Sequence, residues 1–223
     1  MNTLINHSHQ SENILAFDTS GDIASVAVWA DRKMYKASLP FGTHSHSQAA
    51  RLFSIMQGLL NEANITFQDL NVIATPTGPG SFTGIRLGLA TAQGLMLSTK
   101  TAAFAPTTLQ NYAFGAWKEM AESDTIDSFL VTLTTKRGGF YVQGFDKTLK
   151  PLFPASINTQ HEIDDRLAIN SRMLHVEGFS LLSAEYLIQF YFHTINAEQA
   201  LPSILRPYYV HDPEFVKQQP WSL

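Results

Sequence analysis

The sequence of 223 residues contains no cysteine, which excludes disulfide bonds and thiolate nucleophiles and is typical of a reducing compartment. Charged residues make up only 15% of the chain, and the formal net charge is −4. A chain of this composition has no broad basic surface with which to bind a polyanion such as a nucleic acid by itself. Residues 1–12 are polar and carry no long hydrophobic run. We therefore expect a disordered leader, no membrane anchor and a cytoplasmic location.

Several catalytic signatures are also missing from the sequence. No Gly-Lys-Ser or Gly-Lys-Thr follows a glycine-rich run, no Gly-x-Ser-x-Gly occurs, and no two histidines stand four residues apart. These patterns mark phosphate loops, serine hydrolases and zinc sites on helices. His44 and His46 are separated by one residue, a spacing that favours a capping or surface role over metal binding. We expect neither catalytic residues nor metal ligands.

What the chain does contain is a hydrophobic content of 44%, which is enough to fill a core. The apolar pattern predicts three strands first and then alternating helices and strands. This order is typical of a mixed sheet with helices on its faces. The predicted strands cover 14–18, 23–30, 33–39, 71–75 and 102–105, and the predicted helices cover 49–63, 83–98 and a segment that begins near Pro106.

A second unit is predicted after residue 117, where strand patterns return at 129–133 and 140–145. A further helix is expected at 181–192, followed by an irregular tail that is rich in proline. The predicted domains are a polar leader at 1–12, an N-terminal lobe at 13–117 and a smaller C-terminal lobe at 118–223.

The most informative segment is the glycine-rich turn from Thr77 to Arg86, between a predicted strand and a predicted helix. Exposed backbone N–H groups and the positive end of the helix dipole favour an anion at such a turn. Glycines also serve tight turns and the close packing of a helix on a strand, so both interpretations stay open. Asp18 ends the first strand, where a carboxylate holds a metal-bound water near a nucleotide phosphate or only organises the turn. The residues predicted for a nucleotide or anion site are Asp18, Thr19, Gly78, Gly80, Ser81 and Thr83.

The helix predicted at 83–98 is apolar nearly all round, so it must be covered on more than one side. Gly84, Gly88 and Ala92 follow one another at intervals of four residues and would let another backbone approach closely. That neighbour is either the sheet of the same chain or a helix of a partner subunit. The residues predicted for a partner interface are Leu52, Met56, Gly84, Arg86, Leu87, Gly88 and Thr91.

Four segments carry a family resemblance: ILAFDTS at 14–20, SVAV at 25–28, LLNEA at 59–63 and, above all, GPGSFTGIR at 78–86. On these segments the chain resembles the TsaB family, also called YeaZ. The glycine segment is specific for the wider group that contains TsaB and its catalytic relative TsaD. The second half matches weakly, through Leu205-Arg206-Pro207. Thr134 and Gly139 stand where the family has Asp and Glu, and Thr77 replaces a residue that is often basic.

The resemblance implies a two-lobed actin-like ATPase (ASKHA) fold of α/β class, in which each lobe is a ribonuclease-H-like mixed sheet flanked by helices. It implies a non-catalytic platform subunit for making threonylcarbamoyladenosine beside the tRNA anticodon, paired with the catalytic TsaD subunit and the TsaE ATPase. It also implies a homodimer through the two helices described above and contact with tRNA only through the complex. The chain would have no cofactor of its own, and ATP or ADP at a subunit junction stays an open alternative.

Two other functions stay open. An actin-like nucleotide-hydrolysing enzyme or kinase would use Asp18 and the turn from Gly78 to Gly84. A metallopeptidase is suggested only by the glycoprotease label of the wider family. The missing histidine pair makes this third hypothesis the weakest.

Overall fold

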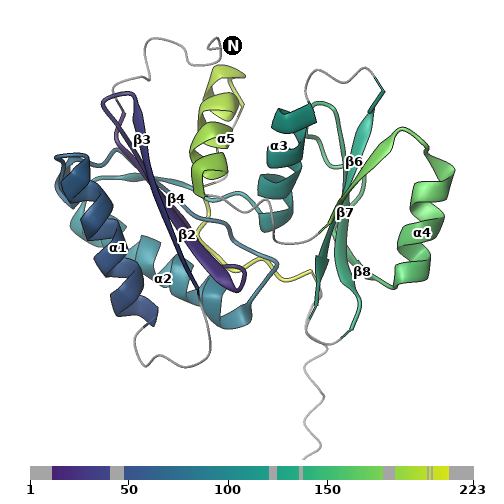
Figure 1. Ribbon diagram of the computed structural model, residues 1–223, viewed down its shortest axis with the longest axis horizontal. Helices are drawn as coiled ribbons and strands as arrows, with labels where there is room; N and C mark the ends of the chain where they lie inside the picture. Colours follow the sequence, from purple (N-terminus) through teal and green to yellow (C-terminus); the bar gives the residue numbers. More distant parts are fainter. Residues whose placement is uncertain are drawn as a thin grey trace, which may run out of the picture.

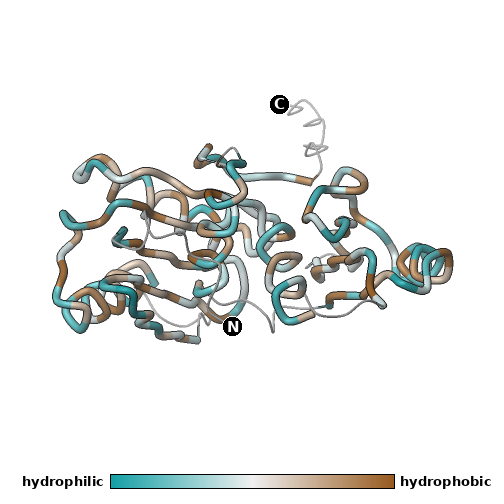
Figure 2. The backbone as a smooth tube through the Cα atoms, turned by 90° about the horizontal axis from the view of Figure 1, so that it is seen from above, coloured by the Kyte–Doolittle hydropathy of each residue, from teal (hydrophilic) through white to brown (hydrophobic). Residues whose placement is uncertain are grey.

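The computed structural model describes residues 12–40, 48–120, 125–135, 138–177, 184–199, 201 and 203–210. In these residues two mixed sheets lie side by side, each with helices on its faces (Figure 1). Seen from above, hydrophobic segments run through both lobes (Figure 2). The predicted α/β fold, with a mixed sheet flanked by helices in each of two lobes, is confirmed.

The first sheet has the strand order β3-β2-β1-β4-β5. Its central strand β1 pairs antiparallel with β2 and parallel with β4, so the sheet is mixed as expected. A parallel pair requires a crossover connection, which the chain supplies as a helix between β3 and β4 and another between β4 and β5. The strand bounds are β1 Ile14–Asp18, β2 Ile23–Ala30, β3 Lys33–Pro40, β4 Val72–Ala74 and β5 Ala102–Phe104.

Helices cover both faces of the first sheet, which explains why β1 is apolar from Ile14 to Phe17. Ile14 and Ala16 belong to the hydrophobic cluster under α5, whereas Leu15 and Phe17 belong to the cluster under α1 and α2. Successive side chains of a strand point to opposite faces, so burial on both faces requires apolar residues at every position. The covering helices are α1 (Gln48–Glu62), α2 (Phe82–Ser98) and α5 (Ala184–Asn196).

The second sheet has the strand order β8-β7-β6-β9. Helix α3 (Thr108–Met120) packs on one of its faces through Leu109 and Tyr112, and α4 (Gln160–Ile169) packs on the other through Ile163. The sequence analysis did not predict β8, α4 or β9, because β8 and β9 are short and the apolar residues of α4 are few. The remaining bounds are β6 Ser128–Thr134, β7 Phe140–Asp146, β8 Ser156–Asn158, β9 Met173–Glu177 and the 3-10 helix η2 Phe67–Asp69.

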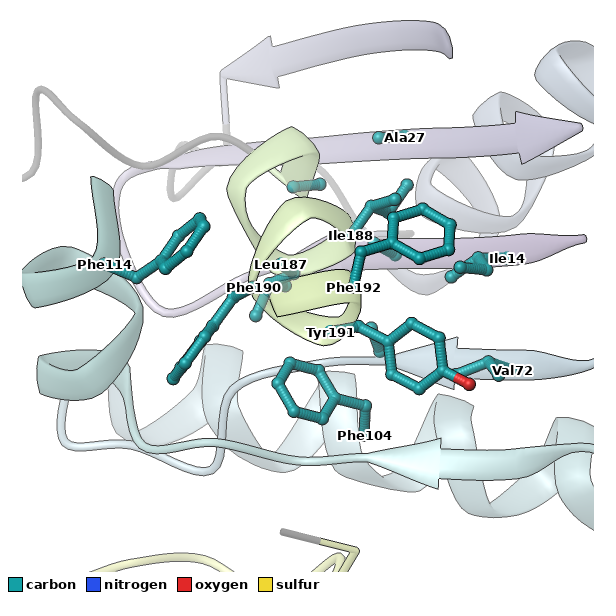
Figure 3. Packing of buried hydrophobic residues seen from close by; sticks show 13 residues of the cluster. Ile14, Ala27, Val72, Phe104, Phe114, Leu187, Ile188, Phe190, Tyr191 and Phe192 are labelled. Carbon is teal, nitrogen blue, oxygen red and sulfur yellow. The ribbon is translucent and has the colours of Figure 1, made fainter. Parts of the chain in front are cut away.

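The lobes meet where α3 packs against α5. The rings of Phe114 and Phe190 are stacked with their centroids 4.9 Å apart, and Phe104 contacts Phe190 edge to face (Figure 3). Helix α5 is the helix expected at 181–192, over its described residues, and it packs on the first sheet although it follows the second in sequence. The domain boundaries at residues 12 and 117 stay predictions. No helix in the described part of the chain is long and apolar enough to cross a bilayer.

His193 gives this junction a dependence on pH. Its ring lies 4.7 Å from that of Trp117 and 5.6 Å from that of Phe114, measured between centroids. Burial lowers the pKa of His193 below its ordinary value of 6.5, because the charged imidazolium is disfavoured away from water. Below that value the unfolded chain therefore binds more protons than the folded chain.

We expect the free energy of unfolding to fall as the pH drops from about 6.5 towards the lower pKa of folded His193. Replacing His193 with Gln should flatten this part of the profile, measured by urea unfolding between pH 7 and pH 5. The control is His161→Gln, which changes an exposed histidine of α4 and should keep the slope of the native chain. An unchanged slope in His193→Gln would contradict the assignment.

Candidate functional site

The carboxylate of Asp18 lies at the carboxyl end of β1 and is buried, with only 1% of its surface exposed. Its Oδ1 atom accepts a hydrogen bond of 2.8 Å from the backbone N–H of Ser20, whereas Oδ2 has no hydrogen-bond partner among the described residues. Burial raises the pKa of Asp18, and the hydrogen bonds from Ser20 oppose this shift. The folded chain therefore holds an acidic group in a place that disfavours its charge.

The glycine turn follows β4 and leads into α2. Gly78 has a φ of 114°, which residues with a side chain rarely adopt. Its carbonyl oxygen accepts a hydrogen bond of 2.7 Å from the N–H of Thr108, at the start of α3. Ser81 is the N-cap of α2, and its Oγ accepts from the N–H of Gly84 at 3.3 Å. Thr83, which the sequence also placed in the site, is exposed in the first turn of α2.

The turn between β1 and β2 packs directly on this glycine turn. The N–H of Ser81 donates a hydrogen bond of 2.7 Å to the carbonyl oxygen of Ser20, and Thr19 Oγ1 donates one of 2.7 Å to the carbonyl of Gly84. A Cβ atom at Gly84 would overlap the carbonyl oxygen of Thr19, and one at Gly80 would lie 2.7 Å from that of Ser20. The structure therefore brings Asp18, Thr19 and the glycine turn together, and fills the space beside the glycines with backbone of the same chain.

Helix α3 adds three buried polar residues that the sequence analysis missed. Thr108 and Asn111 are at most 1% exposed, and their side chains have no hydrogen-bond partner among the described residues. Burial and the charge of Asp18 both raise the pKa of Tyr112, which places this phenol near the carboxylate. Their spacing was the available signal, because positions 108, 111 and 112 share one face of a helix. The result is a buried polar cluster at the lobe junction, made by Asp18, Ser20, Thr108, Asn111 and Tyr112.

This cluster can hold a polar group, but its carboxyl group gives it a negative charge when ionised, which disfavours an anion. Asp18 is its one ionisable carboxyl group, and no cluster of three or more His, Asp or Glu that could hold a metal occurs in the described ranges. Buried polar atoms cost stability when they lack hydrogen bonds. Asp18 Oδ2, Ser20 Oγ and the Asn111 amide are therefore the groups available to a bound water or ligand.

The residues of the predicted partner interface lie in two different environments. Leu52 and Met56 are fully buried in the core cluster of the first sheet, because the apolar stripe of α1 faces that sheet. Gly84 and Gly88 face the turn between β1 and β2, with Thr19 Oγ1 2.7 Å from a Cβ built at Gly88. As placed here, these four residues offer no surface to a partner. The side chain of Arg86 is exposed.

A different row of residues on α2 points outward. Its small members, Ala90 and Gly94, are exposed, and a Cβ at Gly94 would meet nothing within 4 Å. Leu97 is 90% exposed. Gly58 on α1 also has open space around its Cα. The outward row of α2 consists of Phe82, Arg86, Ala90, Gly94 and Leu97. Leu87 and Thr91, from the predicted interface, lie beside it and are partly exposed.

Comparison with known proteins finds relatives over about half of the chain. A family model described as TsaD, tRNA N6-adenosine threonylcarbamoyltransferase, matches residues 42–129. The chain is 37% identical over 106 residues to the tRNA threonylcarbamoyladenosine biosynthesis protein TsaB of Escherichia coli K12, covering 48% of this chain and 45% of that protein. Over about half of its length, the chain is similar to the TsaB (YeaZ) family. It is also 36% identical over 131 residues to TsaB of Buchnera aphidicola subsp. Schizaphis graminum, covering 59% of each.

A solved structure named YeaZ from Pseudomonas aeruginosa has the same fold. It superposes with a TM-score of 0.67 at 20% sequence identity, covering 89% of this chain and 99% of that one. The sequence matches span 45% and 59% of the two TsaB relatives, whereas the structural match covers nearly the whole YeaZ chain. The fold described above is therefore similar to that of the solved YeaZ structure.

Asp18 should reduce the stability of the folded chain at neutral pH. Burial raises the pKa of folded Asp18 above the ordinary value of 3.8. With respect to Asp18 alone, the folded chain is therefore most stable at a pH below 3.8, where Asp18 is protonated, and it loses stability as the pH rises through the folded pKa and the carboxyl group ionises. We expect Asp18→Asn, which keeps the acceptor for Ser20, to raise the free energy of unfolding at pH 8 by about 1–2 kcal/mol. The gain should shrink towards pH 4 in urea titrations. A loss of stability at pH 8 would contradict this account.

Gly84 and Gly94 form a matched pair on one helix. Adding a methyl group at Gly84 should destabilise the chain by about 3 kcal/mol or more, because the carbonyl of Thr19 is backbone and has no rotamer to change. Gly94→Ala should instead stabilise it by about 0.5–1 kcal/mol, since alanine favours helix and has open space there. Thermal unfolding of both variants would test the contact, and equal effects would disprove it.

Proposed function

We propose that this chain is the non-catalytic platform subunit for threonylcarbamoylation of the tRNA adenosine next to the anticodon. In this proposal it pairs with the catalytic TsaD subunit, works with the TsaE ATPase and contacts tRNA only through the complex. The names of the TsaB relatives and of the matching TsaD family model support the pathway. The outward row of α2 supports the pairing.

The observation that best supports the platform role is that backbone of the same chain occupies the space beside the glycine turn. In proteins that bind phosphate at a helix N-terminus, free N–H groups point at the anion. Here the N–H of Ser81 is bonded to Ser20, and the carbonyl of Thr19 lies against Gly84. A phosphate at this turn would meet two backbone carbonyl oxygens, which repel it. The turn therefore works as packing between two segments, and this favours a scaffold over a nucleotide hydrolase.

The outward row of α2 supplies a surface that suits a partner helix. Large side chains stand at its ends, with Phe82 58% and Leu97 90% exposed, and small residues stand between them. A helix with glycine at an exposed interior position is less stable than one with alanine. A Cβ atom added at Gly94 on α2 or at Gly58 on α1 would meet nothing within 4 Å among the described residues, so packing within that part of the chain does not require glycine there. Close approach of a helix from another subunit would require small residues at these two positions.

The same surface serves the homodimer that we also propose, so homodimer and heterodimer would exclude each other. Any ATP or ADP would lie at a subunit junction, where the partner contributes the missing contacts. An actin-like nucleotide-hydrolysing enzyme remains the second candidate, because one observation favours it: Asp18 keeps Oδ2 without a partner in the described residues. Nucleotide hydrolysis by the isolated chain distinguishes the two.

Reconstitution of tRNA threonylcarbamoylation from purified TsaD, TsaE and the enzyme that supplies the threonylcarbamoyl adenylate tests this proposal. We expect the modified nucleoside to fall to background when this chain is omitted, while the chain alone hydrolyses no ATP. Leu97→Glu, which puts a charge on the outward row, should weaken TsaD binding by about tenfold or more.

The control is Ile169→Glu, which charges an equally exposed residue at the end of α4 in the other lobe and should leave TsaD binding unchanged. Undiminished modification without the chain would refute the platform role. Equal loss of binding in both variants would refute the assignment of the surface to α2.

A further inference from the structure

The C-terminal segment 203–210, called the strap below, crosses α2 and the glycine turn (the yellow segment in Figure 1). Gln93 Nε2 donates a hydrogen bond of 2.9 Å to the carbonyl of Leu205, and the N–H of Tyr208 donates one of 2.9 Å to the carbonyl of Thr77. The side chain of Leu205 packs against the core cluster under α1 and α2. The strap is therefore anchored at two backbone positions and one apolar side chain.

The strap brings Tyr209 to the outward row of α2. The Nη2 atom of Arg86 donates a hydrogen bond of 3.2 Å to the hydroxyl of Tyr209, and the guanidinium carbon lies 3.8 Å from the centre of the Phe82 ring. The rings of Phe82 and Tyr209 are 6.5 Å apart. The guanidinium is thus held between a ring and a phenol contributed by segments 123 residues apart in the chain.

Arg86 carries an unpaired positive charge. It is exposed and forms no ion pair with any carboxylate in the described parts of the chain. A guanidinium has five donors in a planar fork that matches a carboxylate, and one of them forms a hydrogen bond within the described residues. Phe82 and Tyr209 are 58% and 50% exposed, so two apolar surfaces flank the free donors.

We infer that Phe82, Arg86 and Tyr209 form a preformed binding site for an Asp or Glu side chain of the partner subunit. Arginine, tyrosine and phenylalanine are enriched among the residues that contribute most to protein interfaces. The stacking and the hydrogen bond fix the guanidinium before binding, which reduces the entropy lost on association. This inference rests on the proposed pairing, and it adds the strap to the interface and names the chemical group that the interface receives.

A protein carboxylate fits this site better than the phosphate of an RNA. Contact with RNA usually involves many basic residues along its backbone, whereas this chain has 15 Lys and Arg against 19 Asp and Glu. Among the outward row of α2, Arg86 is the one charged residue, and its neighbours are apolar or small. A single charge set in an apolar patch is typical of a protein interface.

The test measures the affinity of the full chain for purified TsaD by calorimetry at 50 and 500 mM salt, with thermal unfolding of each variant as a folding check. We expect Arg86→Gln to weaken binding by about tenfold or more at low salt and to remove most of the salt dependence. Tyr209→Phe keeps the ring and loses the hydroxyl, so it should weaken binding by about threefold. The control is Tyr208→Phe, whose hydroxyl has no hydrogen bond within the described residues, and it should bind as the native chain does.

Each other outcome overturns the inference. If Arg86→Gln bound TsaD with the affinity and salt dependence of the native chain, the carboxylate site would be refuted and the proposed function would stand. Equal affinities of Tyr209→Phe and Tyr208→Phe for TsaD would show that the strap is not part of the binding site. An effect of Arg86→Gln on tRNA binding alone, or on self-association alone, would assign the site to RNA or to a second copy of the chain. If the native chain does not bind TsaD at all, the proposed function fails as well.

Discussion

The contact between the turn after β1 and the first residues of α2 determines most of what this molecule presents to its surroundings. The backbone carbonyl of Thr19 lies where a side chain at Gly84 would be, so helix and turn are in backbone-to-backbone contact. This contact fixes the rotation of α2 about its axis, because only the glycine row can face the turn. Once that rotation is set, Phe82, Arg86 and Leu97 must point to solvent, and Asp18 must lie under the start of the helix.

The sequence predicted the first lobe well because its physical signals are strong. A strand buried on both faces is an unbroken apolar run, and the segment from Ile14 to Asp18 could be read without ambiguity. The rotation of α2 could not be predicted. This helix carries two rows of small residues, one through Gly84 and Gly88 and one through Ala90 and Gly94. An almost entirely apolar helix has no polar face to show which row is buried. The sequence analysis therefore assigned Gly84 and Gly88 to a partner interface while keeping packing on the sheet of the same chain as the alternative.

The sequence analysis missed two other features of the site, for different reasons. The spacing of Thr108 and Asn111 places them on one face of a helix, but polar helix residues normally face solvent, so this spacing alone does not mark them as buried at the lobe junction. Tyr209 is aromatic, but it lies in a tail without regular structure, where hydrophobic periodicity carries no information. Both were placed by contacts between distant segments. Local pattern therefore predicted the elements, and long-range packing decided which residues form the site.

Helix α5 closes the first sheet from the far end of the chain, and this has a consequence for the order of folding. Until residues 184–196 have been synthesised, Ile14, Ala16 and the other residues of that face have no cover. The first lobe therefore cannot complete its core on the ribosome before the second lobe has emerged. During synthesis the first lobe therefore starts to form before the second but completes its core after it. An early stop in translation leaves a sheet with one bare hydrophobic face, which is a surface that chaperones recognise.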